Sequence, residues 1–219
     1  MTHPPASSSV PSKTGLVVRW AGRYDLLLTL LTLGREGRLR ERMLDLARLA
    51  PGESILDIGC GTGTLAIAAK RRVGPSAVVH GIDASPEMIA RAERKAKRVG
   101  MEIAFETAPA QSLPFPDARF DVVLSTVMMH HLPRVGREDA VREARRVLKP
   151  GGRLLVVDFV RGSGKGFRAH FHRHGRVDPR DLIALVTGGG LTVIDSGPVG
   201  RWDLQFVLAQ RDTAEVFDV

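Results

Sequence analysis

The chain has 219 residues, 43% of them hydrophobic, which indicates one domain of ordinary size, or one domain with an extension, around a full core. Its longest apolar stretch, Leu26 to Leu33, is too short to cross a bilayer, which needs about 20 residues. The sequence starts without the positive residues and apolar run of a signal peptide. A single cysteine excludes an internal disulfide and fits a reducing, cytoplasmic location.

The chain is strongly basic, with a net charge of +8 and a pI of about 10.5. Such a charge indicates either an anionic partner or a solvated surface in which arginine outnumbers lysine. The basic residues are spread along the chain with only local clusters. We therefore favour a solvated surface, keep peripheral contact with an anionic membrane as the first alternative, and place nucleic acid last.

The chain begins with residues 1–15, which are rich in Pro, Ser and Thr and are expected to form a disordered tail. Residues 16–50 have a helical pattern in which leucines leave little polar face. We expect this segment to be buried, to cover a ligand, or to meet a partner such as a second copy of the chain. The leucines are Leu26, Leu27, Leu28, Leu30, Leu31 and Leu33.

The next stretch, Ser54 to Thr64, is typical of a strand, a tight turn and the start of a helix. A short apolar run ends in glycines at alternate positions, Gly59, Gly61 and Gly63. Glycine tolerates positive φ and lets a ligand approach the backbone without a Cβ in the way. The helix that follows presents free N–H groups at its start. A dinucleotide, a mononucleoside or an amino acid fits such a turn.

The spacing of nearby residues separates these ligands. The dinucleotide pattern G-x-G-x-x-G places a third glycine where this chain has Thr64. Asp57 stands two residues before the first glycine, and a second apolar run ends at Asp83. An acidic residue at the end of the second strand accepts hydrogen bonds from ribose hydroxyls. The pattern favours adenosine with an amino-acid tail over NAD.

Three motifs resemble those of class I S-adenosylmethionine-dependent methyltransferases. They are Asp57-Ile-Gly-Cys-Gly-Thr-Gly63, Gly81-Ile-Asp-Ala-Ser-Pro-Glu-Met88 and Val147-Leu-Lys-Pro-Gly-Gly-Arg-Leu154, in this order across roughly a hundred residues. The sequence is most similar to the group that includes the ubiquinone/menaquinone-biosynthesis methyltransferases. The resemblance implies S-adenosyl-L-methionine as cofactor and S-adenosyl-L-homocysteine as product.

The resemblance also implies an α/β fold. We expect a Rossmann-like, seven-stranded, mostly parallel sheet with helices on both faces, an antiparallel C-terminal hairpin at its edge, and an N-terminal helical lid. The lid takes residues 16–50, the methyltransferase domain 51–211, and a frayed tail 212–219. The later expected elements are strands at 120–126 and 153–159, helices at 85–99, 138–148 and 178–186, and a strand pair at 191–195 and 204–209.

The cofactor-binding residues are carried over from the motifs of the family. They are Tyr24, Asp57, Gly59, Cys60, Gly61, Gly63, Asp83, Ala84, Met88, Ala110, Gln111, Ser125 and His130. In the family a Tyr-Asp pair in the lid points at the amino-acid end of the cofactor, and Tyr24-Asp25 matches that pair. Cys60 is interpreted as a small turn residue rather than a nucleophile.

The chain departs from the family after the third strand. The family has Gly-Asp-Ala-Glu there, and its Asp recognises the adenine amino group. This chain has Pro109 in place of the Asp and Gln111 in place of the Glu. Proline has no side-chain acceptor, so adenine must be met by the backbone N–H of Ala110 or Gln111, or by the Gln111 amide.

Candidate catalytic residues follow the fourth strand. Ligands in open α/β sheets bind beyond the carboxyl ends of the strands, so Ser125 through His131 are expected to face the site. His130 and His131 are the candidate general bases near neutral pH. The alternative is that one packs on the cofactor and the other orients a group. Asp158 ends the fifth strand, either near the acceptor pocket or simply as a hydrogen-bonded strand-end residue.

Two basic regions are interpreted without a catalytic role. Residues 161–176 include His170, His172 and His174, but no cysteine or nearby carboxylate completes a zinc set, so we predict no metal and a flap over the acceptor pocket. The outer face of the helix at 85–99 is predicted to be solvated. Its cations are Arg91, Arg94, Lys95, Lys97 and Arg98.

The predicted function is methyl transfer from S-adenosylmethionine to a small-molecule or lipid-like acceptor by in-line displacement. Base-amino methyltransferases carry an Asn/Asp-Pro-Pro element where this chain has Ser125-Thr-Val-Met128, and cytosine C5 enzymes need a catalytic cysteine. One alternative is a non-catalytic module that binds nucleic acid or membrane through its basic surface. The other is a nicotinamide-dependent oxidoreductase, against which Thr64 argues.

Overall fold

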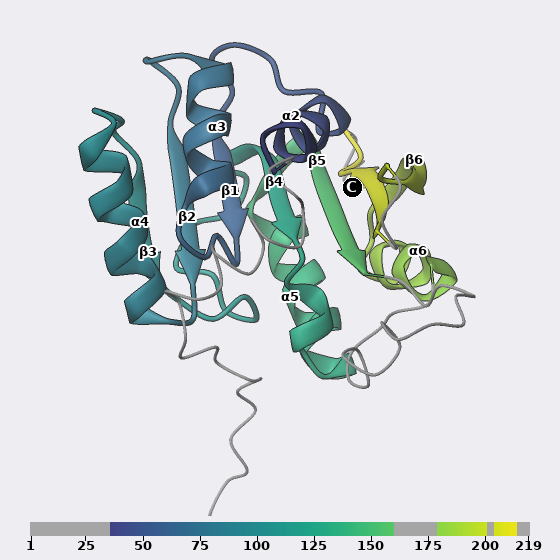
Figure 1. The fold of residues 1–219 in the computed structure, drawn as a ribbon. Coiled ribbons are helices and arrows are strands. Elements are labelled where there is room, and N and C mark those ends of the chain that lie inside the picture. The colour runs from purple at the N-terminus through teal and green to yellow at the C-terminus, as the bar shows by residue number, and fades with distance from the viewer. Residues whose placement is uncertain (1–35, 160–178, 201–203, 214–219) are drawn as a thin grey trace, which may run out of the picture.

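The computed structural model describes residues 36–159, 179–200 and 204–213 (Figure 1). Several sequence-based expectations fall outside these ranges, namely Tyr24, the leucine cluster of the lid and the flap at 161–176. Within the described ranges, no helix is long and apolar enough to pass through a membrane.

A seven-stranded sheet forms the centre of the molecule, in the order β3-β2-β1-β4-β5-β7-β6 (Figure 1). The first five strands run parallel, and β7 pairs antiparallel with both β5 and β6. This is the predicted sheet with its antiparallel C-terminal edge. The strands are β1 (Ile55–Ile58), β2 (Val79–Asp83), β3 (Ala104–Thr107), β4 (Phe120–Thr126), β5 (Leu148–Phe159), β6 (Thr192–Pro198) and β7 (Leu204–Gln210).

Helices cover both faces of this sheet and bury its apolar side chains in two clusters. One cluster joins α2 and α3 to the sheet through residues such as Leu44 and Ala69. The other joins α5 and α6 to the opposite face through residues such as Val141 and Leu182. The helices are α2 (Glu36–Leu46), α3 (Thr64–Val73), α4 (Pro86–Arg98), α5 (Arg134–Val147) and α6 (Pro179–Gly188), with a 3-10 turn at Met129–His131.

Local signals account for where the helices begin. Ser85 caps α4, because its side chain accepts a hydrogen bond from the N–H of Met88 and Pro86 occupies the first helical position. Helix α5 begins at Arg134, four residues before the predicted start at Glu138. Pro133 precedes it in an extended conformation. The helix therefore begins directly after residues 127–133, which follow β4 and are called the histidine loop below.

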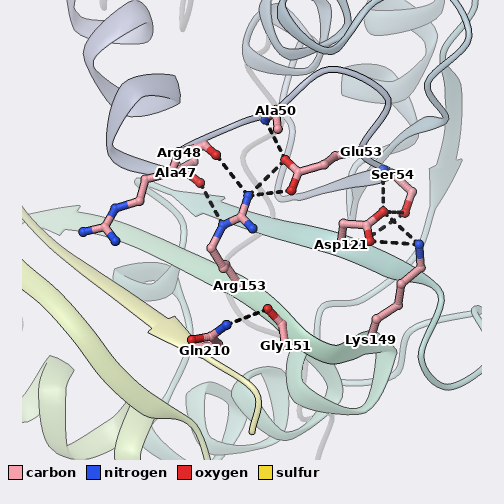
Figure 2. Close-up of polar contacts among 10 residues, drawn as sticks. All are labelled: Ala47, Arg48, Ala50, Glu53, Ser54, Asp121, Lys149, Gly151, Arg153 and Gln210. Carbon is pink, nitrogen blue, oxygen red and sulfur yellow. Dashed lines mark hydrogen bonds and ion pairs between the residues drawn. The ribbon is translucent and has the colours of Figure 1, made fainter. Parts of the chain in front are cut away.

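An ion-pair cluster ties the chain before β1 to the amino end of the sheet (Figure 2). Arg153 contacts both carboxylate oxygens of Glu53 at 2.8 and 3.0 Å, and it also donates to the carbonyl oxygens of Ala47 and Arg48. The side chains of Arg153 and Glu53 are only 19% and 17% exposed. This cluster holds the end of α2 against β5.

A second cluster lies beside it at the same end of the sheet (Figure 2). Asp121 accepts hydrogen bonds from the N–H and hydroxyl of Ser54, at 2.9 and 2.5 Å, and from Lys149 at 2.8 Å. These bonds lower the pKa of Asp121 against the effect of its burial. The two clusters together fix the amino ends of β1, β4 and β5.

Candidate active site

The opposite end of the sheet gathers the residues that the sequence singled out. Because β1, β2, β4 and β5 run parallel, their carboxyl ends meet at one edge. The glycine turn leaves β1 there, Asp83 ends β2, the histidine loop leaves β4, and Asp158 lies next to the end of β5.

The three glycines of the turn all have positive φ, but they make room for different groups. A Cβ on Gly59 would lie 2.4 Å from Met128 Cγ, and one on Gly63 would lie 2.8 Å from both Ala92 and Phe105. A Cβ on Gly61 would meet nothing within 4 Å. Packing therefore requires Gly59 and Gly63, whereas Gly61 is the glycine beside open space where a ligand has access to the backbone.

Asp83 joins the turn to β2. Its carboxylate accepts hydrogen bonds from the N–H of Gly61 and the N–H of Ser85, both at 2.9 Å. Burial raises the pKa of Asp83, and the N–H groups of Ser85 and Gly61 oppose that rise. Each carboxylate oxygen retains lone-pair capacity, so the group can still accept hydrogen bonds from ribose hydroxyls.

Lys95 corrects one expectation from the sequence. We predicted that it lies on a solvated helix face, but it is half-buried, and its ammonium donates to Thr62 Oγ1 and Thr64 Oγ1, each at 2.7 Å. These threonines flank Gly63, so helix α4 braces the glycine turn. The helical spacing places Lys95 on the buried face of α4, because it stands three residues after the buried Ala92 and seven after the buried Met88.

Asp57 lies beneath the turn with an unsatisfied carboxylate. The residue is 1% exposed, and neither oxygen has a hydrogen bond of ordinary length and angle with a residue of the described ranges. Burial, and then the charge of Asp83, raise the pKa of Asp57 from 3.8 to about 7, and the amide of Ala66 offsets part of the rise. A buried carboxylate without a partner is costly, so the position is suited to a cationic group of a ligand.

Two more small polar residues lie buried near this edge. Ser125 is fully buried near the end of β4, in register with Ile58 of β1, and its hydroxyl has no partner among the residues that the structure describes. Cys60 lies inside the turn, where burial raises the pKa of its thiol. A thiol held in its neutral form is not a nucleophile, which agrees with the interpretation of Cys60 as a turn residue.

The loop after β4 is strained. Val127 has a φ of 54°, a conformation that a β-branched residue rarely adopts. Its N–H donates to the carbonyl oxygen of Val157 at 2.7 Å, which holds the start of the loop against β5. The strain turns the chain so that Met128 packs over Gly59.

His130 is paired with Asp158. The ring nitrogen Nδ1 lies 2.7 Å from Asp158 Oδ1, and the backbone N–H of His130 donates to Oδ2 at 2.9 Å. Asp158 is fully buried, whereas the His130 side chain is 15% exposed. The two predicted histidines are adjacent, since the ring centroids of His130 and His131 are 3.9 Å apart. Burial, and then the neighbouring His130, lower the pKa of His131.

Helix α5 holds the loop that replaces the family's adenine-binding motif. Glu143 accepts a hydrogen bond from the N–H of Leu113 at 2.7 Å, and Arg146 donates to the carbonyl oxygen of Leu113 at 3.0 Å. The loop also joins β2, because the N–H of Ala108 donates to the carbonyl oxygen of Asp83. Sequence reasoning missed Glu143 and Arg146, which lie 30 or more residues from the loop they hold.

The remaining predicted contacts lie around the same edge. Ala84 is exposed directly after Asp83, and Ala110 is 8% exposed. Gln111 turns its amide toward Gly136, because a Cβ on Gly136 would lie 3.1 Å from Gln111 Nε2. Met88 is 4% exposed and belongs to the buried face of α4.

These residues fit a nucleoside with a cationic amino-acid tail. The unsatisfied carboxylate of Asp57 suits an ammonium group, Asp83 suits a ribose, and Gly61 offers open space beside the backbone. In the part of the chain that the structure describes, no group of three His, Cys, Asp or Glu side chains is placed to hold a metal ion.

Comparisons with known proteins agree with the motif resemblance. A family model described as a methyltransferase domain matches residues 55–152. The chain is 44% identical to a demethylmenaquinone methyltransferase of Thermus thermophilus over 157 residues, which are 70% of either chain. It is 37% identical to a ubiquinone/menaquinone biosynthesis C-methyltransferase of Geobacter sulfurreducens over 145 residues, 64% of this chain and 54% of that protein.

The fold is also that of a solved methyltransferase. A crystal structure described as a SAM-dependent methyltransferase from Aquifex aeolicus aligns with a TM-score of 0.68 at 23% identity, covering 78% of this chain and 88% of that one. The motif resemblance is confirmed, and so is the predicted seven-stranded sheet with helices around it and antiparallel C-terminal strands. The chain therefore belongs to the S-adenosylmethionine-dependent methyltransferases, in the group similar to the ubiquinone/menaquinone biosynthesis enzymes.

Proposed function

We propose that the chain transfers a methyl group from S-adenosylmethionine to a small aromatic acceptor of the quinol or phenol kind. The observation that carries the proposal is the arrangement of the histidine loop, in which the polar pair of His130 and Asp158 lies beside apolar side chains. Met128 packs on the glycine turn, and the Phe159 ring lies 5.6 Å from the His130 ring in an edge-on arrangement. Aromatic rings favour such edge-on partners, so an aromatic acceptor suits this edge.

The relatives point to the same class of acceptor. By name, the Thermus protein acts on demethylmenaquinone, and the Geobacter protein is a C-methyltransferase of ubiquinone and menaquinone biosynthesis. A quinone precursor combines an aromatic ring with weakly acidic hydroxyl groups. Because the chain spans only about half of the Geobacter protein's length, the acceptor of the whole protein is part of the proposal.

The residues at the carboxyl edge have separate tasks in this proposal. When bound, the cofactor supplies an electrophilic methyl group on a sulfonium with a good leaving group. Asp57 holds the ammonium group, Asp83 holds the ribose, and Ala110 with Gln111 borders the adenine. We assign Ser125, whose buried hydroxyl has no partner among the described residues, to the same ligand. The protein's contribution is alignment and exclusion of water.

The rival hypotheses gain no support. The relatives named above are methyltransferases rather than nicotinamide-dependent oxidoreductases. The case for a nucleic-acid or membrane module rested on basic charge, but several cations are engaged in ion pairs within the fold. These include Arg72 with Asp45, Arg146 with Glu143, Lys149 with Asp121, and Arg153 with Glu53.

The test is transfer of labelled methyl from S-adenosylmethionine to a panel of acceptors. The panel contains demethylated naphthoquinols, simple phenols, amines and phospholipid head groups. We expect turnover with the first two classes and none with the last. Tight binding of S-adenosylhomocysteine combined with turnover of amines alone would contradict the proposed acceptor class. Failure to bind S-adenosylhomocysteine would contradict the assignment of the cofactor residues.

A further inference from the structure

We propose that His130 Nε2 accepts the proton that the acceptor loses, that Asp158 is the positioning residue for this ring, and that His131 is not the base. The inference rests on the proposed methyl transfer and adds to it the identity of the proton acceptor. It also narrows the substrate to molecules that must lose a proton when they are methylated.

Asp158 fixes which nitrogen of His130 is free. The carboxylate receives three hydrogen bonds: from His130 Nδ1 at 2.7 Å, from the His130 backbone N–H at 2.9 Å, and from the Phe159 N–H at 2.7 Å. A carboxylate that receives backbone N–H groups acts as an acceptor, so Nδ1 must carry a hydrogen and donate it. The neutral ring then has its lone pair on Nε2, which is the basic nitrogen.

The surroundings leave that nitrogen available. No residue of the described ranges forms a hydrogen bond with Nε2, and the side chain is 15% exposed whereas Asp158 is fully buried. The contact of Met128 with Gly59 places the histidine loop directly against the glycine turn. Nε2 is therefore a free lone pair at the edge where the cofactor turn lies.

His131 lacks the features of a base. Its pKa is lowered, first by burial and then by His130, and no carboxylate of the described ranges pairs with its ring to fix one nitrogen as a donor. Its backbone N–H donates to the carbonyl oxygen of Met128 and closes the short turn. Within the described ranges, the titratable groups that face His130 are Asp158 on β5 and His131 on its own turn. We assign His131 to packing on the His130 ring, at a centroid distance of 3.9 Å.

The step is balanced without an added reactant. The O–H bond of the acceptor breaks, and its proton goes to His130 Nε2. In methylation at oxygen, the electron pair of that bond forms the new bond to the methyl carbon. In methylation at a ring carbon, a π electron pair of the ionised ring forms the new bond, and the C–H proton of that carbon then moves to oxygen as the ring becomes aromatic again. In both cases the pair of the broken C–S bond stays on sulfur. Asp158 stabilises the imidazolium that results and does not itself take the proton. The proton then leaves to solvent through the exposed part of the ring.

The inference is tested with acceptors of graded acidity in His130→Gln, Asp158→Asn and the matched variant His131→Asn. With a phenol that is protonated at the assay pH, we expect His130→Gln to lose about 10²- to 10⁴-fold in kcat, the usual contribution of a general base. With a phenol that is already ionised at that pH, the loss should be less than about tenfold. An equal loss with both phenols, or the same selective loss in His131→Asn, would overturn the assignment.

Two further readouts separate this inference from the proposed function. Calorimetric binding of S-adenosylhomocysteine should change less than about threefold in Asp158→Asn and His131→Asn, since neither residue belongs to the predicted cofactor contacts. Imidazole nitrogen shifts in the wild-type protein should show His130 protonated at Nδ1, and Asp158→Asn should abolish that preference. A His130 ring protonated at Nε2 would contradict the inference whether or not any acceptor is turned over.

Discussion

Asp83 Oδ2 accepts a hydrogen bond from the backbone N–H of Gly61 at 2.9 Å, which joins the end of β2 to the one glycine of the turn that borders open space. The carboxylate thus shapes the turn before any ligand arrives. Because it also accepts a hydrogen bond from the Ser85 N–H, its position is held by one amide of the glycine turn and one at the start of α4.

Asp83→Ala should weaken binding of S-adenosylhomocysteine at least tenfold, on the order of 1.4 kcal/mol for the loss of a charged hydrogen bond. The matched control is Glu106→Ala, which removes an exposed carboxylate from the neighbouring strand β3 and should leave affinity unchanged. Calorimetric titration measures both. Equal affinities in the two variants would remove Asp83 from the ribose site.

Asp57 should link cofactor binding to pH. Its pKa is about 7 in the fold against 3.8 ordinarily, so between these values the folded state holds a proton that the unfolded chain has lost. The free energy of unfolding of the ligand-free protein should therefore fall as pH rises from 3.8 to 7, and then level off. A bound ammonium group favours the ionised form, so affinity should rise as pH approaches 7.

The measurement for Asp57 is the number of protons released on binding S-adenosylhomocysteine at pH 6.5, from calorimetry in buffers of different ionisation enthalpy. We expect a release approaching one proton per site, and Asp57→Asn should abolish it. The same variant should melt at a higher temperature than the wild type at pH 8 without ligand, because it removes a buried charge. Proton uptake, or no exchange, would contradict the contact with the ammonium group.

Lys95→Met should loosen the glycine turn while keeping the aliphatic stem packed. It removes the two hydrogen bonds to Thr62 and Thr64, and we expect affinity for S-adenosylhomocysteine to fall about three- to tenfold, or roughly 1 kcal/mol. Lys97→Met makes the same change of charge at an exposed position of α4. Equal affinities in the two variants would contradict the conclusion that Lys95 holds the glycine turn in its binding conformation.

Alanine substitutions should show which glycine of the turn is required for packing and which for access of the ligand. Gly59→Ala and Gly61→Ala both place a side chain at positive φ, at a cost of about 1 to 2 kcal/mol. Gly59→Ala should lose more stability, because its Cβ meets Met128, and Met128→Ala should restore part of that loss. Gly61→Ala should instead lose more affinity than stability. Thermal melts and calorimetry on the four proteins give both quantities.

Glu53→Gln should lower stability without altering turnover. It breaks the ion pair with Arg153 at the amino end of the sheet, and we expect a loss of about 1 to 3 kcal/mol, or several degrees in melting temperature. Glu138→Gln breaks an ion pair with Arg134, which is 91% exposed, and should cost almost nothing. A change in kcat for Glu53→Gln would show that the two ends of the sheet are coupled.

The parts of the fold that sequence patterns predicted are those with local signals. The Ser85-Pro86 helix start is set by neighbours within a few residues, and the glycine turn and Asp83 were recognised from the spacing of residues along the chain. The antiparallel C-terminal strands followed from the family resemblance and are confirmed by the pairing of β7 with β5 and β6.

The parts that could not be predicted depend on contacts between distant segments. His130 and Asp158 are 28 residues apart, and only the parallel register of β4 and β5 brings them together. Likewise, the glycine at position 59 is explained by Met128, which no local pattern connects to it. Lys95 was misjudged because a cation among four others on a helix is usually solvated, and its two threonine partners lie 31 and 33 residues earlier.

The pairing of Arg153 with Glu53 has a consequence for how such an enzyme changes over evolutionary time. The ion pairs drawn in Figure 2 lie at the amino end of the sheet, and the proposed acceptor site lies at the carboxyl ends of its strands. Substitutions at the carboxyl ends of the strands therefore leave the contacts between Arg153 and Glu53 in place. A descendant that changes only those residues keeps the contribution of this ion pair to stability.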